Sequence, residues 1–192
     1  MPKVVYLTGA PAAGKSSTMR MLSERVPGLL VWEYGARLTE HIRARDADLV
    51  NQDDLRSRSA GLVTPQDVAE VDAALLAYVD GNRSSNHVLI DSHPVTKETY
   101  GFRITPFSLD QFAQLAPDEI WVLYAGPEET MDRIGRDPAG RPQVTSEEAR
   151  MHTMLQASVA ATYGMSIRCP VYMFDTQGDR GDLADLLAGR LS

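Results

Sequence analysis

The sequence of 192 residues contains one cysteine, Cys169, and this scarcity excludes a disulfide within the chain. Cys169 stands beside Pro170 at the start of an apolar run, so we expect it to be a small core residue. Long apolar runs are also missing, and none approaches the length of about 20 residues that a membrane-spanning helix needs. No signal peptide is visible, because a strand-like run begins at Lys3. We therefore expect a cytoplasmic protein without a membrane partner.

Basic residues are scarce too. Lys and Arg together number 19 against 26 Asp and Glu, and the formal net charge is −7. An excess of negative charge argues against a general nucleic-acid partner. The sequence shows no internal repeat and no low-complexity tract, and its hydrophobic fraction of 43% is ordinary for a globular protein. The length fits one compact domain over residues 1–192.

The most informative segment is Gly9–Ser16, which reads G-x-x-x-x-G-K-S, the phosphate-binding loop or Walker A pattern. It follows a β-rich run at 3–8 and precedes apolar residues at helical spacing, as a phosphate loop requires. The alternative is a chance glycine turn before a helix. The residues expected to bind the nucleotide are Gly9, Ala10, Pro11, Ala12, Ala13, Gly14, Lys15, Ser16 and Ser17.

A triphosphate is a dense cluster of negative charge, and this pattern supplies groups that bind one. Backbone N–H groups of the loop and the positive end of the following helix converge on the phosphates. Gly9 and Gly14 lack a Cβ, so the chain can turn tightly there and approach the phosphates closely. Lys15 is expected to reach the β- and γ-phosphate oxygens, and the Ser16 hydroxyl to bind Mg²⁺. ATP and Mg²⁺ are therefore the expected cofactors.

Asp91 ends an apolar run at 87–91, which is the Walker B position of a phosphate-loop protein. At the end of a strand beside the loop, its carboxylate would hold Mg²⁺ directly or through water. The alternative is that Asp91 merely caps a turn. Ser16 and Asp91 are the expected metal ligands.

Five apolar runs alternating with helix-like segments predict an α/β fold, a five-stranded parallel sheet with helices on both faces. Residues 92–103 read as a loop. Thr64, Ser108 and Thr145 are expected to begin helices as capping residues. The helix that begins after Thr145 is expected to run to Tyr163. Further helices are expected from about residues 15, 36, 127 and 183, and strands at 3–8, 29–32, 87–91, 119–124 and 171–174.

The residues after Asp91 exclude two classes of phosphate-loop protein. A GTPase would show D-x-x-G there, and many ATP-driven motors place glutamate next, whereas Ser92-His93-Pro94 follow here. A kinase whose acceptor is already ionised, such as a nucleoside monophosphate, needs no general base. It needs positive charge around the transferred group, which Arg133, Arg136 and Arg141 are expected to supply as catalytic residues.

With these residues identified, the chain resembles the archaeal-type adenylate kinases, a branch of the nucleoside monophosphate kinases, over nearly its whole length. The resemblance implies a phosphate-loop kinase core with a small helical acceptor-binding region at about 34–82 and a short lid at about 133–147. The matching segments are Thr8-Gly9, Gly14-Lys15-Ser16, Asp54-Leu55-Arg56, Ile90-Asp91-Ser92-His93, Lys97, Tyr100-Gly101-Phe102, Pro117, Arg133, Arg136-Asp137, Glu147-Glu148, His152 and 160–164.

The resemblance also implies roles for single residues. Arg56 and Lys97 would hold the α-phosphate of the acceptor, and Arg133 and Arg136 would serve the transferred phosphoryl group. The family's tendency to form oligomers, often trimers, implies a possible homo-oligomer. Arg56 could instead belong to a solvated charge cluster with Asp53 and Asp54.

Two further residues are candidates for acceptor binding. His93 could contact the acceptor or equally cap the strand end, and Arg103 lies beside an aromatic residue in the expected acceptor loop. His152 is expected to make a structural hydrogen bond from its helix.

The sequence departs from the family pattern at three places that bear on function. The lid carries one displaced arginine, Arg141, where the family usually has two, and the family's Asn-Arg pair reads Gln156-Ala157. The family's glycine–tyrosine–leucine–proline–glycine loop reads Gly101-Phe102-Arg103-Ile104-Thr105-Pro106, near the expected acceptor pocket. The expected activity is ATP-dependent phosphoryl transfer to a nucleoside monophosphate, of the type 2 ADP = ATP + AMP. The alternatives are a kinase for a nucleoside, sugar or antibiotic, with Asp91 or a nearby carboxylate as base, or a nucleotide-binding module without transfer.

Overall fold

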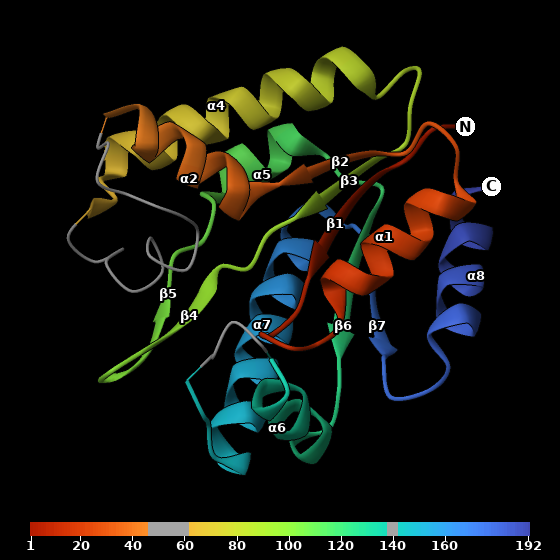
Figure 1. Ribbon diagram of the computed structural model, residues 1–192. Coiled ribbons are helices and arrows are strands. Elements are labelled where there is room, and N and C mark those ends of the chain that lie inside the picture. Colours follow the sequence, from red (N-terminus) through yellow and green to blue (C-terminus); the bar gives the residue numbers. More distant parts are fainter. Residues whose placement is uncertain (46–61, 138–141) are drawn as a thin grey trace.

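The computed structural model describes residues 1–45, 62–137 and 142–192. Figure 1 shows a central sheet with helices packed on both sides of it. In the described part of the chain, no helix is both long and apolar enough to cross a membrane. Arg56 and Arg141, two residues with expected roles, lie outside the described residues.

The five predicted strands are confirmed and form one sheet in the order β2-β3-β1-β6-β7, with every neighbouring pair parallel. The order places β1 in the middle, so the segment that follows it lies at the centre of the sheet's carboxyl edge. From β1 the chain crosses to β2 on one side of the sheet, and after β3 it crosses to β6 on the other side. Sheets of this class bind ligands where the direction of crossing changes. The strands are β1 (Val4–Thr8), β2 (Leu30–Glu33), β3 (Val88–Asp91), β6 (Glu119–Tyr124) and β7 (Val171–Asp175).

Alternating residues of β1 face two separate hydrophobic cores. Val4 and Tyr6 belong to one cluster, and Val5 and Leu7 to the other. Since both faces of the sheet are buried, its strands read as continuous apolar runs rather than alternating ones. The first core contains residues of α4 (Pro65–Asn82), α5 (Leu109–Leu115) and α7 (Ser146–Ile167), and the second those of α1 (Lys15–Arg25) and α8 (Arg180–Leu191).

Three predicted helix starts are confirmed as capping boxes, at Thr64, Ser108 and Thr145. In each, the cap side chain accepts from a backbone N–H of the first turn, and a side chain of that turn bonds back to the cap's own N–H. Three helix boundaries differ from prediction: α2 (Tyr34–Arg45) begins directly after β2, α7 continues past Tyr163 to Ile167, and α8 begins at Arg180 rather than near 183. The remaining helix, α6, covers Pro127–Gly135.

The prediction of a loop at 92–103 is wrong. The segment forms an antiparallel hairpin of β4 (Val95–Glu98) and β5 (Gly101–Ile104). Its strands have four residues each and mix polar with apolar residues, so no apolar run marks them. The overlooked signal is Gly101, whose φ of 135° is a left-handed value that glycine adopts easily at a tight turn.

A stability prediction follows from the way α7 approaches the sheet. A Cβ at Gly164 would meet Cγ2 of Val171 on β7 and lie 2.8 Å from the carbonyl oxygen of Cys169. We expect Gly164→Ala to lower the free energy of unfolding by about 1–3 kcal/mol through overpacking. The matched control is Gly81→Ala in α4, where a Cβ meets nothing within 4 Å, and it should stabilise by about 0.5–1 kcal/mol. Urea unfolding of both variants measures the difference, and equal effects would contradict this account of the packing.

Candidate active site

The phosphate loop lies close against the sheet at the end of β1. A Cβ at Gly9 would collide with the backbone carbonyl oxygen of Leu123 on β6, so only glycine permits this approach. Gly14 adopts the left-handed conformation, with φ 85° and ψ 8°, at the cap position of α1. No side chain caps this helix. An uncapped helix start after a glycine turn can bind an anion through its backbone N–H groups.

Lys15 folds back over the loop. Its ammonium donates to the carbonyl oxygen of Gly9 at 2.9 Å and lies 4.0 Å from Oδ1 of Asp91. The side chains of Lys15 and Asp91 are only 12% and 14% exposed, so their charges interact in a partly desolvated place. The structure therefore brings the predicted catalytic lysine beside the predicted metal ligand.

The predicted metal ligands fit Mg²⁺ in their chemistry. Asp91 ends β3 and pairs in register with Leu7 on β1, which places it beside the phosphate loop. Ser16 lies in the first turn of α1. Among the described residues, no group of three or more His, Cys, Asp or Glu side chains could hold a metal. A carboxylate and a hydroxyl suit Mg²⁺, which usually takes one or two protein ligands together with substrate phosphates and water.

Hydrogen bonds hold the side chain of Arg133 beside the phosphate loop. Its guanidinium donates to the carbonyl oxygen of Ala12 at 3.2 Å, to Oγ1 of Thr176 at 3.0 Å and to the carbonyl oxygen of Thr176 at 2.7 Å. Glu129 on the same helix accepts from its Nε at 2.7 Å. Arg136, by contrast, pairs with Asp132 and is 78% exposed. Of these two predicted residues, the structure brings only Arg133 into contact with the loop.

Sequence reasoning missed Thr176, which is 4% exposed and joins Arg133 to the end of the sheet. It lies directly after β7, and its Oγ1 donates to the carbonyl oxygen of Tyr124 on β6. A polar residue that follows an apolar strand of a parallel sheet is the signal that could have identified it.

Two of the predicted acceptor-binding cations, Lys97 and Arg103, lie on the hairpin and face carboxylates, whereas Arg56 lies outside the described residues. Lys97 pairs with Glu148 on α7 at 3.1 Å, and Arg103 pairs with Glu98 at 3.1 Å. Hydrogen bonding by the backbone of Thr145 and then by Lys97 holds the pKa of Glu148 below its ordinary value. His93 immediately precedes the hairpin, after the end of β3. The structure thus places Lys97 and Arg103 on one element but on opposite faces of it, since Arg103 pairs in register with Thr96, the neighbour of Lys97. His93 lies two residues before this element.

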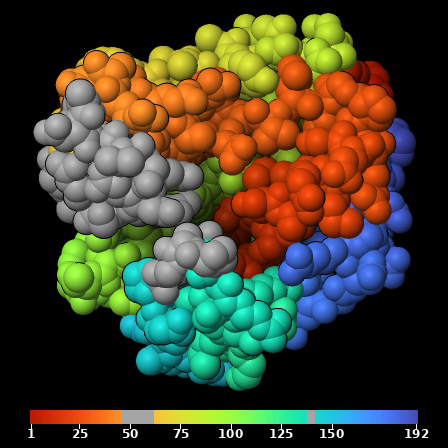
Figure 2. Space-filling model, viewed as in Figure 1, coloured from red at the N-terminus to blue at the C-terminus, as the bar shows by residue number. Residues whose placement is uncertain are grey.

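Figure 2 shows that the surface is hollowed at the centre of this face. The hollow lies between the orange atoms of α2, the red atoms of the phosphate loop and α1, and the teal atoms of α6. The green atoms of the hairpin lie on its far side from α1. These elements enclose the carboxyl edge of the sheet, where Lys15 and Asp91 meet.

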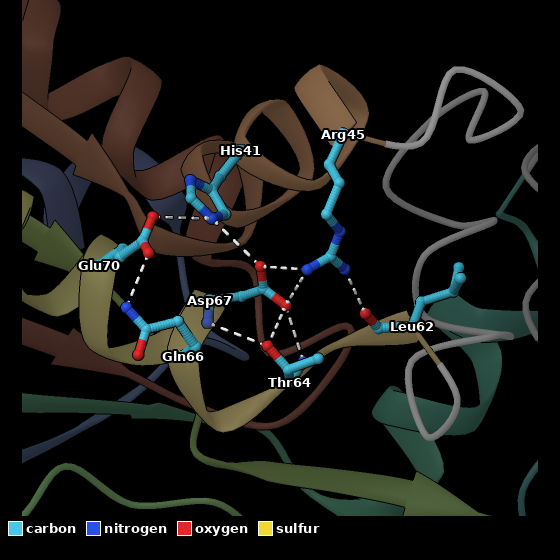
Figure 3. Close-up of polar contacts among 7 residues, drawn as sticks. All are labelled: His41, Arg45, Leu62, Thr64, Gln66, Asp67 and Glu70. Atoms are coloured by element: carbon cyan, nitrogen blue, oxygen red, sulfur yellow. Dashed lines mark hydrogen bonds and ion pairs between the residues drawn. The ribbon is translucent and has the colours of Figure 1, made fainter.

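A buried carboxylate joins α2 to α4 beside this region (Figure 3). Asp67, which is 3% exposed, accepts from Arg45 at 2.7 and 2.9 Å and from the N–H and hydroxyl of Thr64 at 2.8 and 2.6 Å. His41 lies 3.2 Å from the same carboxylate, and Arg45 also donates to the carbonyl oxygen of Leu62 at 2.8 Å. Arg45 and Leu62 are the described residues on either side of 46–61, and this network joins them.

Comparison with known proteins assigns the chain to a family. The model of a family described as an AAA domain matches residues 8–150, from the end of β1 to the first turns of α7. The chain belongs to this family. It is also similar to an adenylate kinase of Pyrococcus furiosus, at 25% identity over 94% of this chain and 90% of that protein.

Solved structures agree with this assignment at the level of fold. A sugar kinase from a Janibacter species has a TM-score of 0.59 at 12% identity, over 100% of this chain and 96% of that chain. A shikimate kinase from Acinetobacter baumannii has a TM-score of 0.57 at 16% identity, over 100% and 97%. The chain therefore has the fold of the P-loop kinases. Its kinase relatives support the activity of a phosphotransferase.

The Asp67 network generates a prediction about acid stability. Burial opposes ionisation, yet hydrogen bonds from Thr64 and the charge and hydrogen bonds of Arg45 lower the pKa of Asp67 from 3.8 to about 2. A lowered pKa means that the carboxylate stabilises the fold above about pH 4 and loses this effect as the pH falls towards 2. We expect Asp67→Asn to cost about 1–2 kcal/mol at neutral pH, measured by urea unfolding.

The control for this variant is Glu70→Gln. Glu70 is 52% exposed, and its carboxylate lies 3.6 Å from His41, which is too far for a strong hydrogen bond. Glu70→Gln should change stability by less than about 0.5 kcal/mol. The difference between Asp67→Asn and the parent should stay constant from pH 7 to about pH 4 and shrink below it. A difference that persists unchanged near pH 2 would contradict the assignment.

Proposed function

We propose that this P-loop kinase transfers the γ-phosphoryl group of ATP to a nucleoside monophosphate, as in 2 ADP = ATP + AMP. One observation carries the proposal: a hairpin with two cations, Lys97 and Arg103, begins next to the phosphate loop. Gln156 bonds both to Thr8, directly before the loop, and to Val95, the first residue of β4. A cation near the loop suits an anionic second substrate. The similarity to an adenylate kinase supports the same conclusion.

In this proposal, the nucleotide phosphates bind the backbone N–H groups of Gly9–Ser16 and the start of α1. Lys15 would exchange its contact with the carbonyl oxygen of Gly9 for the β- and γ-phosphate oxygens. Ser16 and Asp91 would hold Mg²⁺, which when bound offsets the charge of the phosphates and aligns them. The chain's own contribution is to place a cation and a carboxylate at one end of a fixed anion site.

The acceptor phosphate would bind Lys97 on the hairpin and Arg56 from the region at 34–82. Arg103 and His93 would contribute further contacts to the acceptor. Lys97 and Arg103 already lie within 3.1 Å of the carboxylates of Glu148 and Glu98, a distance typical of charge-assisted hydrogen bonds. An anionic phosphate would replace those carboxylates as the partner.

The transfer itself needs no general base. An ionised phosphate oxygen of the acceptor attacks the γ-phosphorus, the bond from phosphorus to the β-bridging oxygen breaks, and ADP leaves with that electron pair. Arg133 is held next to the phosphate loop, and Arg136 and Arg141 lie in the proposed lid at about 133–147. Closure of this lid would add their charge to the transferred group and exclude water.

A second candidate, from another substrate class, rests on the register of the sheet. Glu33 ends β2 and pairs with Asp91 on β3, so two carboxylates stand side by side at the edge near Lys15. An acceptor that presents a neutral hydroxyl needs such a base. The structural neighbours named sugar kinase and shikimate kinase are consistent with this candidate.

A coupled assay that follows ADP formation separates the two candidates. We expect turnover with ATP, Mg²⁺ and at least one nucleoside monophosphate, and little turnover with sugars or nucleosides. Glu33→Gln should leave transfer to the monophosphate within about threefold of the parent, because no base is required. Turnover only with a neutral hydroxyl acceptor, abolished by Glu33→Gln, would replace the proposal with the second candidate.

Removing the ammonium of the phosphate loop tests the ATP site directly. Lys15→Met keeps the length of the side chain and removes its charge, so we expect kcat to fall by about 100- to 1,000-fold. The matched control is Arg20→Ala, an exposed cation of the same helix, which should change kcat less than about threefold. Equal activities of Lys15→Met and the parent would contradict the proposed role of the loop.

A further inference from the structure

A polar connection inside the core joins the phosphate loop's strand to the acceptor hairpin. Gln156 on α7 is fully buried, at 0% exposure. Its Oε1 accepts from the hydroxyl of Thr8 at 3.2 Å, and its Nε2 donates to the carbonyl oxygen of Val95 at 3.2 Å. A carbonyl oxygen can only accept, so the amide nitrogen must face Val95. Because a buried amide without partners is costly, both contacts hold the side chain in place.

His152 makes a second contact to the same carbonyl oxygen. It lies one helical turn before Gln156, and its Nε2 donates to the oxygen of Val95 at 3.0 Å. Burial, together with the charges of Lys15 and Lys97, lowers the pKa of His152, so the ring is neutral at pH 7 with its proton on Nε2. The expected structural hydrogen bond of His152 is thereby confirmed.

The hairpin contacts His152 from its other strand as well. The ring of Phe102 on β5 packs edge-on against His152, with centroids 5.2 Å apart. Phe102 pairs in register with Lys97 on β4. One face of α7 therefore holds both strands of the element that carries Lys97 and Arg103.

Both ends of this connection lie next to the proposed substrates. Thr8 directly precedes Gly9, whose carbonyl oxygen accepts a hydrogen bond from the ammonium of Lys15. Val95 begins β4, two residues before Lys97. Phosphoryl transfer needs the reacting atoms aligned about 3–3.5 Å apart, and a shift of about 1 Å can cost about 100-fold in rate. A rigid link between these ends fixes that separation.

We infer that Gln156, supported by His152, is a positioning residue that sets the acceptor hairpin at a fixed distance from the phosphate loop. The inference rests on the proposed function, because it requires that the hairpin binds the acceptor. Gln156 acts through Thr8 and Val95 and touches neither substrate. Its removal should therefore misalign the substrates without emptying the ATP site.

The test uses Gln156→Met, which keeps the length of the side chain and removes both hydrogen bonds. The matched control is Tyr163→Phe on the same helix, which loses the hydroxyl that accepts from the N–H of Phe107 at 2.7 Å. Hydrogen exchange of the amides of residues 95–102 is measured in the free protein and with Mg·ATP. We expect exchange at least tenfold faster than in the parent for Gln156→Met and less than threefold faster for Tyr163→Phe.

Kinetics give the second readout. Gln156→Met should lower kcat with the best monophosphate 10- to 100-fold and leave the KM for ATP within threefold, whereas Tyr163→Phe should leave both within threefold. Thr8→Val removes the other end of the connection. If the Thr8–Gln156 bond carries the effect, the double variant Thr8→Val, Gln156→Met should have a kcat no lower than that of Gln156→Met alone. Thr8→Ser keeps the hydroxyl and should retain the parental kcat.

Unchanged exchange of residues 95–102 in Gln156→Met, or an equal loss of kcat in Tyr163→Phe, would overturn the inference. If the parent transfers phosphate to no monophosphate, the proposed function fails, and the exchange result still decides whether Gln156 holds the hairpin. If Gln156→Met does not fold, Thr8→Val takes its place in the exchange experiment, because it keeps the shape of the side chain.

Discussion

The site depends on how closely the phosphate loop approaches the central sheet. The chain leaves β1 at Gly9, where the carbonyl oxygen of Leu123 leaves no room for a Cβ, and it enters α1 at the left-handed Gly14. These two backbone conditions hold the start of α1 at the middle of the carboxyl edge without a capping side chain. An uncapped helix start in a protein of net charge −7 is a local site for an anion on a molecule that otherwise repels anions.

The order of the strands then decides which distant residues join the loop. Because β1 lies between β3 and β6, Asp91 stands beside Lys15 on one side, and Thr176 reaches Arg133 from β7 on the other. Helix α7 then holds the hairpin that carries Lys97 through Gln156 and His152. The phosphate loop and the proposed acceptor hairpin are thus two parts of one packed unit, rather than two independent surfaces.

Sequence reasoning succeeded where a single local cause determines the structure. The strands are apolar because both faces are buried, the capping boxes mark their own helices, and the phosphate loop is defined by its glycines. It failed for the hairpin, whose short mixed strands contact α7 some 50 residues later, as in the bond from His152 to Val95. No local pattern could have shown that Gln156 reaches Thr8 or that Arg133 bonds to Thr176, because these partners are set by the packing of separate elements.

The central claim is that the Gly9–Ser16 loop and Lys15 bind the phosphates of ATP beside Asp91. A crystal structure with Mg²⁺ and a non-hydrolysable ATP analogue tests it most directly. We predict that the triphosphate lies in the loop, with the Lys15 ammonium moved from the carbonyl oxygen of Gly9 to a phosphate oxygen. A nucleotide bound elsewhere, or a Lys15 still bonded to Gly9 beside a bound nucleotide, would contradict the account.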